Sequence, residues 1–73
     1  MADIDVDTRG ETCPIPLVEM RKAVMAAAEG DVIRVRGTHP ASMKEIPMAV
    51  EALGITLKDV EGVETDWTIT IER

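Results

Sequence analysis

The chain has 73 residues, of which 45% are apolar and 30% charged, and Trp67 is its one aromatic residue. This length holds a single domain, which we expect to span residues 1–73, and lies near the lower limit for independent folding. Cys13 and His39 are the only residues of their types, which excludes an intramolecular disulfide and leaves a Cys/His zinc site without ligands. We therefore expect no metal site and a core of aliphatic side chains.

The net charge of −6 arises from 14 acidic and 8 basic residues. A protein of that sign repels a polyphosphate, so direct binding to nucleic acid is not expected. No segment approaches the roughly 20 apolar residues of a membrane span, and Asp3, Asp5 and Asp7 interrupt the N-terminal stretch. A lone cysteine fits a reducing compartment, and we expect a cytoplasmic protein that does not contact membranes.

Hydrophobic periodicity and turn residues predict six elements in chain order. They are a strand over Asp3 to Thr8, a helix over Pro14 to Ala28, a strand over Val32 to Arg36, a helix over Ala41 to Leu53, and strands over Ile55 to Val60 and Asp66 to Glu72. Right-handed crossovers between parallel strands would place both helices on the same side. The order β-α-β-α-β-β predicts an α+β fold, a two-layer α/β sandwich with two helices on one face of a four-stranded mixed sheet.

Glycine, serine and proline mark the expected ends of these elements. Gly30 is expected to stop the first helix and Gly54 the second, because glycine readily takes the left-handed conformation that closes a helix. Ser42 is a candidate cap for the second helix. Pro47 lies inside that helix and lacks a backbone N–H, so we expect a kink or a late start. The last two strands are expected to join around Gly62.

Cys13 lies where the first strand passes into the first helix. Pro14 suits the first helical position, which puts Cys13 at or next to the N-cap. There, the positive end of the helix and its free N–H groups favour a thiolate. Pro16 removes one donor and leaves the amides of Ile15 and Leu17 to face the sulfur. Cys13 is either such a reactive thiol or a small buried hydrophobe with a structural role.

The segment Cys13-Pro14-Ile15-Pro16, preceded by Gly10 and followed by a helix, resembles the signature of the TusA/SirA-like sulfur-carrier family. The resemblance covers nearly the whole chain and includes Glu45-Ile46-Pro47 in the second helix. It implies that Cys13 accepts a sulfane sulfur and becomes a persulfide. It also implies that Gly10 and the two flanking prolines shape the loop around the sulfur.

The resemblance further implies a relay rather than a stand-alone turnover enzyme, with no cofactor. A cysteine desulfurase or rhodanese would supply the sulfur and another protein would accept it, for tRNA 2-thiouridine or other sulfur metabolism. Arg9, Arg21 and Lys22 are candidates for partner docking or for lowering the pKa of the thiol. Glu11 and His39 depart from the residues that the family commonly has at these places. We expect a monomer.

Two other functional classes remain open at this point. A non-catalytic interaction or regulatory module would use Cys13 only structurally. A small RNA-binding domain would suit the shape of a sheet with two helices, but the acidic charge and the near absence of stacking aromatics disfavour it. His39 could serve as a base or a ligand, although a lone histidine in a turn is more often exposed and inert.

Overall fold

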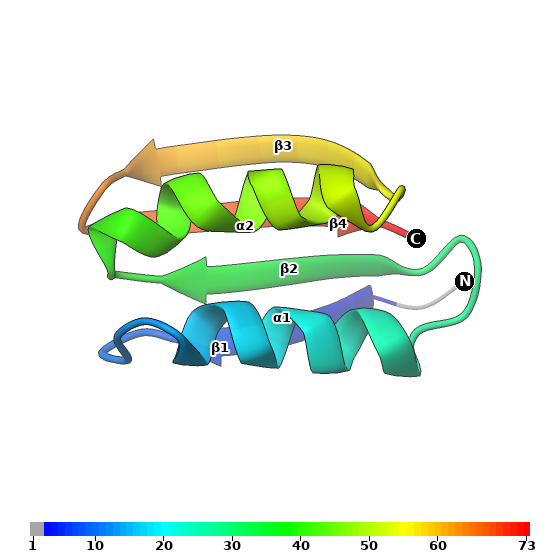
Figure 1. The fold of residues 1–73 in the computed structure, drawn as a ribbon, viewed down its shortest axis with the longest axis horizontal. Coiled ribbons are helices and arrows are strands. Elements are labelled where there is room, and N and C mark those ends of the chain that lie inside the picture. The colour runs from blue at the N-terminus through cyan, green and yellow to red at the C-terminus, as the bar shows by residue number, and fades with distance from the viewer. Residues whose placement is uncertain (1–2) are drawn as a thin grey trace.

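A computed structural model describes residues 3–73, and the first two residues of the expected domain lie outside the described residues. Six elements follow the predicted order. They are β1 (Asp3–Thr8), α1 (Ile15–Ala26), β2 (Val32–Gly37), α2 (Pro40–Ala52), β3 (Thr56–Val63) and β4 (Asp66–Glu72). Figure 1 shows both helices side by side over one face of the sheet, with their first turns at the same end. The loops that precede the two helices therefore share that end of the molecule.

The four strands form one mixed sheet in the order β1-β2-β4-β3. Strands β1 and β2 are parallel, because α1 carries the chain back across the sheet between them. The pairs β2–β4 and β3–β4 are antiparallel. The predicted fold class, a two-layer α+β sandwich with both helices on one face of a mixed sheet, is confirmed.

The core lies between the helices and the central strands and is aliphatic apart from one indole ring. Alternate residues of β2 and β4 face the helices, as the two-residue period of a strand requires. The buried hydrophobic residues are Met20, Val24, Ala27, Ile33, Val35, Ile46, Val50, Trp67, Ile69 and Ile71. At about 25 cal/mol per Å² of apolar surface buried, this cluster is the main source of stability.

Helix α1 is shorter at both ends than the predicted span from Pro14 to Ala28. Pro14 is the N-cap rather than the first helical residue. At the other end the chain turns extended at Ala27, and Gly30 is not the residue that closes the helix. The guanidinium of Arg73 donates to the carbonyls of Val24 and Ala27, the latter at 2.8 Å. A residue from the far end of the chain thus donates to carbonyls at the C-terminal end of the helix.

Helix α2 begins at Pro40, one residue before the predicted start, and His39 rather than Ser42 is its cap. The backbone N–H of Ser42 donates to Nδ1 of His39 at 3.3 Å, and the Ser42 hydroxyl lies 2.9 Å from the same nitrogen. Pro40 suits the first helical position because its missing N–H would have no partner there. Pro47 lies within an uninterrupted helix that runs to Ala52.

Strand β3 is longer than the predicted span from Ile55 to Val60 and includes Gly62, which was expected in the turn. All eight of its residues are exposed, and its register with β4 shifts between Leu57 and Asp59. Such an irregularity breaks the alternation of apolar and polar residues on which a strand prediction relies. Strand β2 also extends one residue further than predicted, to Gly37.

Gly37→Ala is expected to destabilise the protein by about 1–3 kcal/mol, a typical cost of overfilling a packed core. Gly37 is buried at the end of β2, and a Cβ there would overlap the Trp67 ring and lie 3.0 Å from Thr8 Oγ1. Urea unfolding followed by circular dichroism measures the change. Adding Trp67→Leu should make the Gly37→Ala step cheaper, and purely additive losses would contradict an obstacle at the ring.

Candidate functional site around Cys13

The loop between β1 and α1 is tied to the loop that precedes α2. Gly10 has a φ of +84°, a conformation that costs other residues energy, and its N–H donates to Oγ1 of Thr38 at 2.9 Å. Within the loop, the N–H of Glu11 donates to the carbonyl of Thr8 at 3.1 Å. These bonds hold together the loop that contains Gly10, to which the family resemblance assigns loop shaping.

Cys13 is exposed at the end of this loop, immediately before the N-cap of α1. The Cys13–Pro14 peptide bond is cis, and the carbonyl of Pro14 accepts from the N–H of Val18 at 2.9 Å. Pro16 is buried at the start of the helix and fixes the first turn against the core. The N–H of Ile15 donates to the carbonyl of Thr12 at 2.9 Å. The expectation that this amide faces the sulfur was therefore wrong.

The strongest influence on the sulfur from another element was not foreseen. The Cys13 thiol donates to Oε2 of Glu45, on α2, at 3.6 Å. Partial desolvation raises the pKa of the Cys13 thiol above its ordinary value, and the negative charge of Glu45 and this hydrogen bond raise it further. The expectation of a thiolate favoured by the helix end is therefore wrong for the free protein.

Arg9 does not offset the negative charge at the sulfur. Its guanidinium donates two hydrogen bonds to the carboxylate of Asp7, from Nε at 2.9 Å and from Nη2 at 2.8 Å. Hydrogen bonds from the Arg9 side chain and backbone lower the pKa of Asp7 to about 2. Because both groups are well exposed, the pair contributes little to stability.

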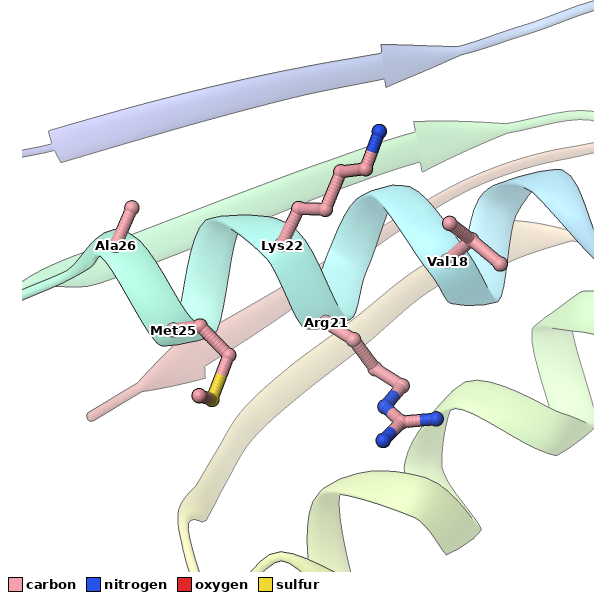
Figure 2. Close-up of a pocket in the computed structure, with 5 residues that line it drawn as sticks. All are labelled: Val18, Arg21, Lys22, Met25 and Ala26. Atoms are coloured by element: carbon pink, nitrogen blue, oxygen red, sulfur yellow. The ribbon is translucent and has the colours of Figure 1, made fainter.

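Arg21 and Lys22 lie on the outer surface of α1, beside exposed apolar side chains (Figure 2). They line a shallow pocket with Val18, Met25 and Ala26, and Met25 is 76% exposed. Figure 2 shows the Arg21 side chain directed toward α2 and Lys22 directed toward the opposite side of α1. Lys22 also pairs with Glu19 at 3.6 Å. We call this basic and apolar area the α1 surface. It includes neither Cys13 nor Glu45.

The other singled-out residues have structural places. His39 caps α2, and its carbonyl accepts from Nε1 of Trp67 at 3.0 Å, so the residue is half-buried rather than free in solvent. Glu11 is exposed in the loop.

Residues 3–73 hold no group of three or more His, Cys, Asp or Glu side chains arranged for a metal ion. None of the helices in the same residues is long and apolar enough to cross a membrane.

Comparison with known proteins places these features in a family. Residues 4–73 match the family model described as "Sulfurtransferase TusA". A protein of Archaeoglobus fulgidus named "Putative sulfur carrier protein" is 37% identical over 68 residues, which are 93% of each chain. The sulfur carrier protein TusA of Allochromatium vinosum is 33% identical over 61 residues, which are 81% of this chain and 80% of that one.

A solved structure agrees with these sequence matches. The crystal structure of a SirA-like protein from Desulfitobacterium hafniense superposes with a TM-score of 0.73 at 26% identity, covering 99% of this chain and 96% of that one. The lone exposed cysteine before the first helix fits a sulfur carrier. The chain belongs to the TusA family, and its role is that of a sulfur carrier.

Proposed function

We propose that this protein carries a sulfane sulfur as a persulfide on Cys13 and relays it from a donor protein to an acceptor protein. The observation that carries the proposal is the exposure of Cys13 in the β1–α1 loop. The Gly10–Thr38 hydrogen bond joins this loop to the loop that precedes α2. Membership of the TusA family supports the proposal. The donor is a cysteine desulfurase or a rhodanese, and the acceptor is a further relay protein or a modifying enzyme.

The chemistry needs one cysteine and no cofactor. A thiolate attacks the outer sulfur of a persulfide, one S–S bond forms as another breaks, and the product can pass its sulfur on in the same way. The partner supplies the second cysteine, which is why the single cysteine of this chain suffices. The protein is therefore a substrate of two partners in turn rather than a stand-alone turnover enzyme.

The α1 surface is the proposed docking area for the sulfur donor. It combines the cations of Arg21 and Lys22 with the exposed Val18 and Met25, on the helix that begins just after Cys13. A donor with an acidic rim around an apolar patch would complement it in charge and hydrophobicity. Such a contact would bring the donor close to the first turn of α1.

Reversing the charge of the α1 surface, with Arg21→Glu and Lys22→Glu together, should slow sulfur uptake from the donor by roughly 3- to 10-fold at low salt. The difference from the unmodified protein should shrink at high salt, because screening weakens steering. Initial rates of persulfide formation measure the effect. Arg36→Glu and Lys58→Glu together, on the sheet, make the same change in net charge and are the matched control, and an equal slowing in that variant would contradict docking at α1.

A structural role for Cys13 is the alternative, and the exposure of the side chain weighs against it. The side chain is exposed, and it is not among the buried residues that form the core. A structural cysteine of this kind would normally be enclosed by apolar atoms. If Cys13 can be alkylated only after the protein has been denatured, that result would favour the structural role.

We also propose that the chain works as a single-domain cytoplasmic monomer, with tRNA 2-thiouridine as the first end product to assay. The free thiol fits a reducing compartment, and size-exclusion chromatography with light scattering tests the monomer.

The relay itself is tested by incubation with a cysteine desulfurase and free cysteine. The intact mass should increase by one sulfur atom, and dithiothreitol should remove it. If the mass stays unchanged with an active cysteine desulfurase and also with a sulfur-loaded rhodanese, the proposal is contradicted.

A further inference from the structure

The sulfur of Cys13 has a carboxylate beside it and no available cation from its own loop. The thiol contacts Oε2 of Glu45, on α2, at 3.6 Å. The basic residue of the loop, Arg9, is held by Asp7. Glu11 adds a further negative charge to the loop. The electrostatic environment of the reactive atom is therefore negative.

This environment opposes the charge that sulfur transfer creates. A thiolate at Cys13 forms next to the half-buried carboxylate of Glu45, and the anionic outer sulfur of a persulfide would feel the same repulsion. Lys22 of the α1 surface pairs with Glu19, and the charge that shifts the thiol within residues 3–73 is that of Glu45. A docked partner can supply the compensating charge.

We propose that Glu45 is a specificity-determining residue that makes the Cys13 sulfur selective for partners carrying a Lys or Arg side chain beside their own reactive cysteine. The inference rests on the proposed carrier function and adds the chemistry of the partner's contact surface. In the free protein the negative charge of Glu45, 3.6 Å from the sulfur, disfavours the Cys13 thiolate. A partner's cation that pairs with Glu45 on docking removes the repulsion and lets the thiolate form where the sulfur is to be transferred.

The transfer step balances without an oxidant or a reductant. Once the partner's cation pairs with Glu45, the Cys13 thiol loses its proton to solvent, and Sγ attacks the outer sulfur of the donor persulfide, R–S–S–H. The S–S bond of the donor breaks as the new S–S bond to Cys13 forms. The departing thiolate, R–S⁻, takes up a proton from solvent and leaves as R–SH, so one sulfur atom has moved with no net change in oxidation state.

Two thiol reagents of opposite charge test this selectivity in the full chain. The cationic 2-(trimethylammonio)ethyl and the anionic 2-sulfonatoethyl methanethiosulfonates both form a mixed disulfide with Cys13. Their rate ratio at one pH does not depend on the thiolate fraction, because both rates scale with it. One unit charge about 4 Å away in water changes a rate by about fivefold, so Glu45→Gln should lower the cationic-to-anionic ratio by roughly 5- to 25-fold.

Matched variants separate a local charge from a general one. Glu51→Gln makes the same change further along α2 on an exposed residue and should leave the ratio unchanged within about twofold. Glu45→Asp keeps the charge and should retain most of the preference. The pH midpoint of the reaction should also fall in Glu45→Gln, since the carboxylate raises the pKa of the thiol. Circular dichroism of each variant checks the fold.

A second arm uses two short peptides with the same activated disulfide, one flanked by lysines and one by glutamates. The unmodified protein should react faster with the lysine peptide, and Glu45→Gln should remove most of this preference. Equal ratios in the unmodified protein and Glu45→Gln, or an equal drop in Glu51→Gln, would overturn the inference. Sulfur loading by a desulfurase is measured separately. If the protein is loaded with sulfur but shows no preference for cationic reagents, only this inference is contradicted. If it shows the preference but is not loaded, only the carrier function is contradicted.

Discussion

Cys13→Ser should abolish sulfur loading while leaving the fold intact. The hydroxyl that replaces the thiol cannot form a persulfide under these conditions, and no second cysteine exists in the chain to take its place. The side chain is exposed and outside the core, so its replacement should change the stability by no more than about 0.5 kcal/mol. Intact mass after incubation with a desulfurase and cysteine measures the loss.

The matched control for this loss is Thr12→Ser, which changes the neighbouring residue and keeps the thiol. Thr12 is exposed, and the bond it makes to the N–H of Ile15 comes from its backbone carbonyl, which the substitution preserves. This variant should load as the unmodified protein does. An added sulfur on Cys13→Ser would place the carried atom elsewhere and would end the case for Cys13.

Trp67→Ala should destabilise the protein by about 3–5 kcal/mol, the usual cost of removing a large aromatic side chain from a core. The ring is 1% exposed, and its Nε1 donates to the carbonyl of His39 at 3.0 Å. The loss is comparable with the total stability of many small domains, so a large unfolded fraction is expected. Urea or thermal unfolding followed by circular dichroism measures it, because the variant has no tryptophan fluorescence.

Trp67→Phe separates the packing of the ring from its hydrogen bond. It keeps an aromatic ring in the core but leaves the carbonyl of His39 without the indole donor. A loss clearly smaller than that of Trp67→Ala is expected, since most of the buried apolar surface stays. Equal losses in the two variants would show that the hydrogen bond at the start of α2, rather than packing, dominates.

The order and type of the elements could be predicted because their periodicity is local. The alternation around Ile4 and Val6 and the helical spacing of Met20 and Val24 directly reflect which face each element buries. The sequence also led to the right family through the residues around Cys13. These features need only neighbours in the chain, so no tertiary information was required to read them.

The ends of the elements depend on tertiary contacts and were predicted less well. Helix α1 ends where Arg73 reaches back to its carbonyls, and α2 begins where a histidine takes the capping role. Strand β3 has no buried face, so its composition carries no alternating signal, and its irregular register obscured the rest. Such interactions pair residues that are distant in sequence or of unusual type.

The site shows the same division between local and long-range information. The positions of Gly10, Cys13 and Pro16 followed from the loop itself, whereas the contact between Cys13 and Glu45 requires α2 to pack beside α1. The segment containing Glu45 was recognised as part of the family resemblance. Nothing in a linear pattern, however, places its carboxylate at the sulfur, and the sign of the pKa shift at Cys13 was consequently mispredicted.

The most direct test of the account follows one sulfur atom through the protein. The sulfur-loaded chain is separated from its donor and mixed with a protein that bears an acceptor thiol, and the intact masses of both are recorded over time. We expect the extra sulfur to leave this chain and to appear on the acceptor in equal amount, without added reductant. Sulfur that remains on Cys13 until dithiothreitol is added would contradict a relay.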